Sequence, residues 1–339
     1  MKLWTPILSA IVLIATATSS AFAQDTTWNI GFVRATGTSY MDTLETVPER
    51  ISAVTNGRLK IKLYDTLVPG TDQPAAVRDG RLDGSFAVNP WLSGEAPIMN
   101  YGHLPGLLTD VGEYQEMLDP LLRGEMEKVW IEKYNAIQLA TAVFETQAII
   151  TRKPLHKVED FKGMKTRVHN TESAALIGQL GAIPVSVNFA EIVPALQRGI
   201  VDAVMTSVGT VNGGGFPAVA KELSIWRIGT IVTWSFVVNS DSWKALPDDL
   251  KPIVEAEFRK IEDEHFANHE AFTQMNIDKL KSAGMNIYIA PPEALEQLFS
   301  EKFTQPVYES WYALNEKTGT DGRALVAKIK ALQALRTQE

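Results

Sequence analysis

Residues 76–87, AVRDGRLDGSFA, resemble residues 195–206, ALQRGIVDAVMT. Each stretch has the pattern of a helix end, a glycine that stops the helix, an aspartate in the turn and then a strand. Glycine suits the cap because the left-handed conformation carries no Cβ penalty there. Aspartate can satisfy backbone groups of a turn, so we interpret Asp83 and Asp202 as structural residues. Two such units about 120 residues apart predict two lobes of similar design.

Outward from these units, strand and helix patterns alternate along the chain. This alternation predicts an α/β architecture in which helices cover a mostly parallel sheet. A long helical pattern over 242–280 is long enough to lie across both lobes. Ligands of open α/β sheets bind outside the carboxyl ends of the strands, which points to Asn89–Trp91 and Thr206–Ser207. The predicted strands are 28–33, 59–64, 84–88, 136–146 and 164–168, and the predicted helices are 41–55, 73–79, 113–134, 171–180, 189–198, 293–314 and 324–335.

Composition limits the possible functions. The chain has 339 residues, which favours two domains, and its 45% hydrophobic and 21% charged residues are typical of a globular protein. The net charge is −8 without a basic tract, which argues against nucleic acid because binding there neutralises phosphates. Cysteine is absent, which excludes a disulfide scaffold, a thiolate zinc site and a cysteine nucleophile.

The first residues have the pattern of a secretory signal peptide. Lys2 supplies a positive charge, residues 7–17 are almost all apolar, and Ala21-Phe22-Ala23 fits a cleavage site. The alternative, a membrane anchor, is disfavoured because the apolar run is short for a span of about 20 residues. We therefore predict a signal peptide at residues 1–23 and a periplasmic mature protein.

Catalytic motifs are scarce. The chain has no G-x-S-x-G, P-loop or G-x-G-x-x-G pattern, and we predict a flexible loop at Gly213-Gly214-Gly215. His265 and His269 have the spacing of a zinc helix. However, Phe266 stands where that motif needs glutamate, and the acidic run 262–264 indicates a solvated face. His103, His156 and His169 belong to no known catalytic pattern. We predict no metal, no cofactor and no enzyme activity.

Several segments resemble one protein family when taken in order. The segments are EDFKGMKTRV at 159–168, GAIP at 181–184, FAE at 189–191, ALQRGIVD at 195–202 and SWKALPDDL at 242–250. Together they resemble the solute-binding proteins of TRAP transporters, the DctP type, over roughly residues 28–318.

The resemblance implies a two-lobed periplasmic-binding-protein fold with mixed, mostly parallel sheets and a long inter-lobe helix. It places 24–146 plus about 233–275 in lobe I, and 147–232 plus about 276–339 in lobe II. The expected hinge lies near 145–150 and 231–237. Members of the family capture an organic acid and deliver it to a TRAP membrane permease driven by an ion gradient. We expect a monomer whose partners are a small organic acid and the subunits of a TRAP membrane permease.

The resemblance also implies binding residues. Arg167 corresponds to the arginine that clamps the ligand carboxylate, and a guanidinium fork matches a carboxylate bidentately. Gln147 stands where some members have a second arginine, which favours a monocarboxylate over a dicarboxylate. Arg34 and Arg152, near predicted strand ends, would be needed to hold a second carboxylate. The other expected contacts are Phe189, Thr206, Asn89 and Trp91, with Trp91, Phe144, Phe189 and Trp234 as an apolar wall.

The predicted ligand is therefore a monocarboxylate with an apolar or aromatic body. The alternatives are a C4-dicarboxylate-binding protein, a ligand-sensing module for a membrane receptor, and a secreted enzyme that acts on a small acid.

Overall fold

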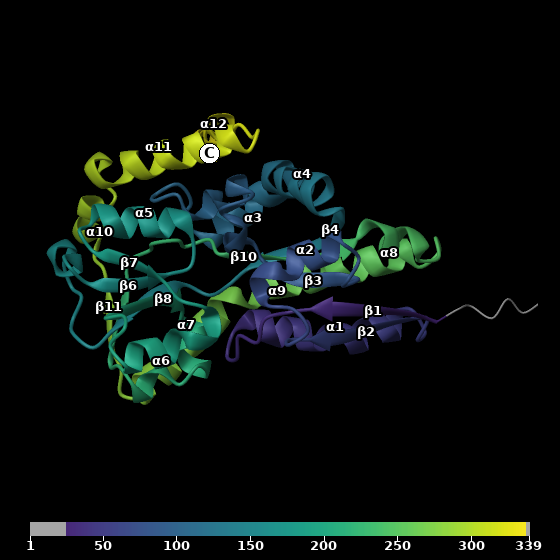
Figure 1. Cartoon of the computed structure of the whole chain (residues 1–339), viewed down its shortest axis with the longest axis horizontal. Coiled ribbons are helices and arrows are strands. Elements are labelled where there is room, and N and C mark those ends of the chain that lie inside the picture. The colour runs from purple at the N-terminus through teal and green to yellow at the C-terminus, as the bar shows by residue number, and fades with distance from the viewer. Residues whose placement is uncertain (1–24, 337–339) are drawn as a thin grey trace, which may run out of the picture.

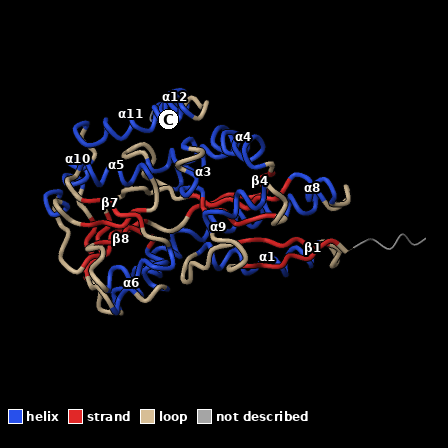
Figure 2. Tube along the Cα trace, viewed as in Figure 1, coloured by secondary structure: helices blue, strands red, loops and turns tan. Residues whose placement is uncertain are grey.

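The computed structural model describes residues 25–336, so the predicted signal peptide lies outside the described residues. Two β-sheets, each covered by helices, form two lobes that lie side by side (Figures 1 and 2). Five of the nine strand pairings among the described residues are parallel and four are antiparallel. The predicted two-lobed α/β fold with mixed sheets is confirmed.

The first lobe contains a five-stranded sheet in the order β2-β1-β3-β10-β4. Strand β10 is antiparallel to both neighbours, while β1 is parallel to β2 and β3. The strands are β1 (Thr26–Gly31), β2 (Leu59–Tyr64), β3 (Gly84–Val88), β4 (Ala136–Val143) and β10 (Thr233–Asn239).

The second lobe contains a six-stranded sheet in the order β11-β9-β5-β8-β6-β7. Strand β5 is antiparallel to β8 and β9, and the other pairs are parallel. The strands are β5 (Gln147–Thr151), β6 (Lys165–Val168), β7 (Ile183–Ser186), β8 (Ala203–Ser207), β9 (Glu222–Ile225) and β11 (Asn286–Ile289).

Helices cover both sheets and join the lobes. The α-helices are α1 (Ser39–Val54), α2 (Gln73–Arg78), α3 (Val111–Met117), α4 (Arg123–Tyr134), α5 (Thr171–Gln179), α6 (Ile192–Gln197), α7 (Val208–Gly213), α8 (Ser240–Ala245), α9 (Lys251–Ser282), α10 (Pro292–Leu298), α11 (Glu301–Lys317) and α12 (Gly322–Arg336). Short helical turns precede or join them, among them η2 (Asn89–Leu92) and η3 (Pro97–His103). None of the helices in residues 25–336 is both long enough and apolar enough to cross a membrane.

The two repeated units have equivalent structural roles, as predicted. The carboxylate of Asp83 accepts hydrogen bonds from the backbone and side chain of Asn29, and that of Asp202 accepts one from the Lys165 backbone. Each aspartate thus anchors the start of its strand to the neighbouring strand. The glycines of the two helix ends, Gly80 and Gly199, have φ values of 67° and 73°, which favour glycine.

Within residues 25–336 the chain crosses between the lobes at four places, the last of them between α11 and α12. Strand β4 of the first sheet is followed almost at once by β5 of the second, and β9 returns to β10. The two crossings touch, since the Phe144 backbone N–H donates to the Val232 carbonyl at 2.8 Å. Helix α9 is the third connection, and it packs against α1 and β4 of the first lobe and α7 of the second.

Three predicted helices are interrupted. The 242–280 pattern is two helices, α8 and α9, because Pro247 lacks a backbone N–H and stops the first. The 113–134 pattern is broken by a π-helical turn at Leu118–Leu122, and the 293–314 pattern divides into α10 and α11 at Ser300. Gly213 belongs to helix α7, so the prediction that it lies in a loop is wrong.

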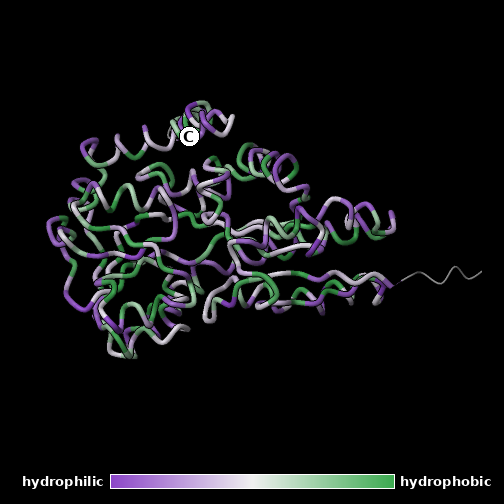
Figure 3. The backbone as a smooth tube through the Cα atoms, viewed as in Figure 1, coloured by the Kyte–Doolittle hydropathy of each residue, from purple (hydrophilic) through white to green (hydrophobic). Residues whose placement is uncertain are grey.

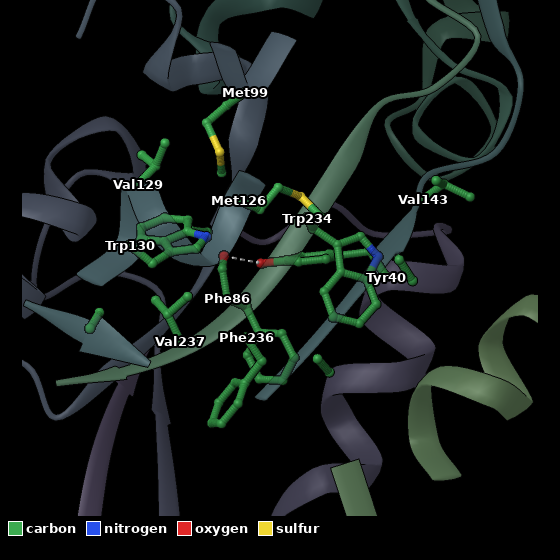
Figure 4. Packing of buried hydrophobic residues seen from close by; sticks show 14 of the residues in the cluster. Tyr40, Phe86, Met99, Met126, Val129, Trp130, Val143, Trp234, Phe236 and Val237 are labelled. Atoms are coloured by element: carbon green, nitrogen blue, oxygen red, sulfur yellow. Dashed lines mark hydrogen bonds between the residues drawn. The ribbon is translucent and has the colours of Figure 1, made fainter. Parts of the chain in front are cut away.

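The hydrophobic core of the first lobe is rich in aromatic residues (Figure 4). The Tyr40 hydroxyl donates to the Phe86 carbonyl at 3.1 Å, and the rings of both residues contact Trp234. Two further clusters fill the second lobe. Apolar residues concentrate inside both lobes and polar residues at the helix surfaces (Figure 3).

The end of the chain returns to the first lobe. Helix α11 packs against α5 of the second lobe, while Leu325, Val326 and Ile329 of α12 join the core of the first. The predicted lobe bounds assign residues 276–339 to lobe II, and this assignment stays a prediction. The tail covers both lobes along one side of the molecule (Figure 1).

Candidate ligand-binding site

A chamber lies between the lobes where β3, β6 and β8 end. It has about 440 Å³ of empty space, its open mouth included, and it opens into a wider outer cleft. The first lobe contributes Val33, Ala35, Tyr40, Val88 and Trp91, the crossings contribute Phe144 and Val232, and the second lobe contributes Gln147, Arg167, His169, Phe189, Thr206, Ser207 and Thr210.

Arg167 is the cationic residue of the chamber. It lies in β6, paired with Val185 of β7 and Val204 of β8, and is only 3% exposed. Its guanidinium donates to the carbonyls of Val187 at 3.4 Å and Met205 at 3.1 Å. Burial lowers the pKa of Arg167 to about 10, so the group stays charged at neutral pH. Among the described residues it forms no ion pair, so a buried cation faces the chamber without a counterion.

His169 lies two residues beyond Arg167 and lines the same chamber. Its Nε2 atom lies 3.2 Å from the Nε2 atom of His103, which ends η3 in the first lobe. Burial, the nearby His103 and the charge of Arg167 lower the pKa of His169 well below its usual value. The ring is therefore neutral at neutral pH, and the chamber holds one positive charge.

Neutral polar groups line one side of the chamber. Ser207 caps α7 by accepting the Thr210 N–H at 3.2 Å, and its hydroxyl donates to the Thr210 hydroxyl at 3.1 Å. Gln147 donates to the Glu145 carbonyl at 3.1 Å. Hydroxyl and amide groups can orient a polar ligand, but they supply no charge.

Aromatic residues from both lobes also line the chamber. Trp91 of the first lobe and Phe189 of the second meet at the mouth, with ring centroids 6.3 Å apart. Tyr40 and Phe144 stack behind them at 5.1 Å. The chamber therefore combines one cation, a row of hydroxyls and an apolar wall.

Six of the eight residues predicted for the site line this chamber: Arg167, Gln147, Phe189, Thr206, Trp91 and Phe144. Asn89 and Trp234 do not. Asn89 is fully buried, where its amide donates to the hydroxyls of Thr233 and Ser235. Trp234 is also fully buried in the core of the first lobe (Figure 4). In both cases the side chain is enclosed by packing that the sequence pattern does not reveal.

Tyr40 and His169 also line the chamber, although neither is among the site residues predicted from the sequence. His169 has a signal, because side chains alternate along a strand and residue 169 continues the face of Arg167. Tyr40 has none, since it lies just before the predicted helix 41–55 and belongs to the first turn of α1 only in the structure.

The two further arginines considered for a second carboxylate lie elsewhere. Arg34 borders the outer cleft and pairs with Asp65 at 2.5 Å. Arg152 donates to the carbonyls of Leu196 and Gln197. Neither arginine lines the chamber.

His265 and His269 are buried in α9, so the predicted solvated face is wrong. Their Nε2 atoms contact the carbonyls of Val143 at 2.7 Å and Phe144 at 3.1 Å. Within residues 25–336, no group of three or more histidine, aspartate or glutamate side chains is arranged to hold a metal ion.

Comparisons with known proteins agree with this architecture. The sialic acid-binding periplasmic protein SiaP of Vibrio cholerae is 25% identical over 340 residues, covering 98% of this chain and 100% of SiaP. A monocarboxylate 2-oxoacid-binding periplasmic protein of Nostoc is 25% identical, covering 80% of this chain and 79% of its own. The crystal structure of DctP7 from Bordetella pertussis, a receptor that binds pyroglutamic acid, superposes with a TM-score of 0.81 at 20% identity, covering 90% and 99% of the two chains.

The sequence pattern of a whole protein family also matches this chain. The family of bacterial extracellular solute-binding proteins, family 7, matches residues 30–315, which is most of the chain. Its members are binding proteins of transport systems rather than enzymes. The chain therefore belongs to the DctP family of TRAP-type periplasmic solute-binding proteins.

Proposed function

We propose that this protein captures a small organic monocarboxylate with an apolar or aromatic body and delivers it to a TRAP membrane permease. The observation that carries the proposal is Arg167, a buried guanidinium without an acidic partner among the described residues. A buried charge is costly unless it is paired, so the chamber is arranged to receive an anion. A carboxylate would complete the fork of Arg167 with two parallel hydrogen bonds.

The charge count of the chamber favours a single carboxylate. Gln147 is neutral, the His169 ring is neutral, and Arg34 and Arg152 are engaged elsewhere. A second carboxylate would be buried without a cation, at a desolvation cost of several kcal/mol. A C4-dicarboxylate is therefore the less favoured ligand.

The apolar wall favours a flat or branched body. Val33, Val88 and Val232 complete a surface with the four aromatic side chains Tyr40, Trp91, Phe144 and Phe189. Burial of apolar ligand area against this surface contributes about 25 cal/mol per Å² to the binding free energy. Pyroglutamate is the ligand named for several solved structures of similar fold, and orotate is the ligand of another. Both are small carboxylic acids built on a ring.

Calorimetric titration tests the proposal. The mature chain is unfolded and refolded to remove bound ligand, then titrated with pyroglutamate, benzoate, a branched 2-oxo acid and succinate. We expect binding in the first three classes and weaker binding of succinate. Arg167→Ala should abolish binding, while Arg34→Ala, the matched control in the outer cleft, should not. Tight binding of succinate alone would overturn the ligand class, and equal effects of the two variants would overturn the role of Arg167.

A further inference from the structure

His103 and His169 connect the two lobes through one hydrogen bond. His103 belongs to η3, which packs on the first lobe, and is 2% exposed. His169 follows β6 of the second lobe and lines the chamber. Their Nε2 atoms lie 3.2 Å apart, and their rings meet edge to face. One ring must therefore donate through Nε2 while the other accepts, which each can do when neutral.

The close packing around His103 leaves the ring little freedom. The chain between β9 and β10 passes beside it at Gly229, which has a φ of 60°. A Cβ atom there would lie 2.7 Å from the His103 ring and 3.0 Å from the Met205 side chain. Glycine at this position lets the crossing segment approach the histidine pair.

The surroundings of the pair disfavour a positive charge. Arg167 of β6 is the charged neighbour of His169, and within residues 25–336 neither ring has a carboxylate partner. Glu172, on the helix α5 that packs against η3, is protonated at neutral pH because burial raises its pKa to about 8. Burial lowers the pKa of His103 to about 3. A second proton on either ring would therefore be expelled in this arrangement.

We propose that His103 and His169 form a neutral pair across the cleft, and that the lobes close on the ligand only when neither ring carries an additional proton. His103 is then a positioning residue that acts through His169. The inference rests on the proposed function, because it concerns the same chamber. The inference also deepens the proposed function, since a neutral pair leaves Arg167 as the one cation that lines the chamber within residues 25–336.

The proposal predicts that ligand capture releases protons. In separated lobes each ring would titrate near its ordinary value of about 6.5, whereas in the closed pair both remain neutral. Closure is therefore little affected by pH above 6.5, and protonation of the two rings opposes it progressively as the pH falls below 6.5. Protonation of each ring should weaken ligand binding about tenfold when the pH falls from 7.5 to 5.5.

The experiment compares wild type with His103→Gln, which keeps a neutral donor and acceptor but does not titrate. Pyroglutamate is titrated at pH 6.5 in buffers of different ionisation enthalpy, which counts the protons released. Wild type should release about 0.5 proton more than His103→Gln, and its Kd should rise about tenfold more between pH 7.5 and 5.5. Any contribution of Glu172 is common to both proteins and cancels. His156→Gln, at an exposed histidine stacked on Tyr288, is the matched control and should behave as wild type.

A second measurement needs no ligand. The unfolding equilibrium constant in urea is compared at pH 7.5 and 5.5 for wild type and His103→Gln. In lobes that close without a ligand the pair forms before binding, so the effect of protonation is divided between this constant and the Kd. The rises of the two constants in wild type, relative to those in His103→Gln, should multiply to about tenfold. Failure of pyroglutamate to bind would therefore count against the ligand assignment and leave the histidine pair testable. His103→Asn replaces the glutamine variant if that variant does not fold. Equal pH dependence of wild type and variant in both measurements would overturn the proposal.

Discussion

At the scale of single residues, the fork of Arg167 decides whether a ligand carboxylate is held. Lysine keeps the charge but offers a point donor instead of two parallel N–H groups. Arg167→Lys should therefore bind the acid at least tenfold more weakly, and Arg167→Ala should lose about 2–5 kcal/mol of binding free energy. Calorimetry at pH 7.5 measures both. A lysine variant with wild-type affinity would show that the fork is not used.

Glu172 makes a separate prediction about stability. Both carboxylate oxygens are buried without a hydrogen-bond partner, and burial raises the pKa of Glu172 to about 8. Because this value lies above that of the unfolded chain, stability is lost as pH rises from about 4.5 to 8. Glu172→Gln should raise the free energy of unfolding at pH 8 by roughly 2–4 kcal/mol and have little effect at pH 4. Urea denaturation at the two pH values checks this, and an equal effect at both would contradict it.

The position of Arg167 in its strand can be predicted from the sequence, whereas its role in ligand binding stays a prediction. Arg167 lies inside the strand predicted at 164–168, close to its carboxyl end and a few residues after Gly163, so this position is clear from the sequence. Asn89 lies at another predicted strand end, but its side chain turns into the core to meet Thr233 and Ser235, which are 144 and 146 residues away. Such pairings between distant segments depend on the register of β10 against β3, which no local pattern carries.

At the scale of elements, α7 brings the two lobes into direct backbone contact. A Cβ atom on Gly213 would overlap the carbonyl of Thr36, and one on Gly209 would lie 2.6 Å from the carboxylate of Glu145. Glycine at these positions thus permits the loop before α1 to lie against α7.

We predict that Gly213→Ala prevents this approach. Relieving such an overlap costs about 1–3 kcal/mol, so ligand affinity should fall by about tenfold or more. The ligand-contacting side chains are unchanged, and the fold of each lobe should persist. Gly178→Ala is the matched control, because it lies in a helix with no atom within 4 Å of the added Cβ. Calorimetric titration of both variants checks the prediction, and wild-type affinity in the Gly213 variant would contradict it.

Element boundaries show the limits of periodicity. The apolar spacing of 242–280 continues through Leu246-Pro247, so the pattern alone joins α8 to α9. Likewise, the glycine-rich stretch at 213–215 reads as a loop, although Gly213 is needed within α7 for close packing. At Gly213 tertiary contacts override the local signal. At Pro247 the stop is itself local, but the apolar spacing does not register it.

At the scale of the whole molecule, the two lobes should close on the ligand about the paired crossings at Phe144 and Val232. Because the chain has no cysteine, two introduced cysteines can be labelled without background. Labels at Glu45 and Gln179, exposed in opposite lobes, should move closer when saturating ligand is added. A pair at Glu45 and Glu132, both in the first lobe, is the control and should stay unchanged. Fluorescence energy transfer between the two labels reports the distance. Equal transfer with and without ligand for the Glu45–Gln179 pair would argue against closure.

The strand order of the first lobe has a consequence for how the chain is made. Strand β10, contributed by residues 233–239, lies between β3 and β4, and α12 at the far end of the chain fills part of the same core. The amino-terminal sheet is thus completed by segments synthesised late. Contacts between such distant segments form slowly, because loop closure must precede them. A nascent chain therefore lacks a finished first lobe until α12 has been synthesised, so this lobe can complete its core only after nearly all of the described chain is available.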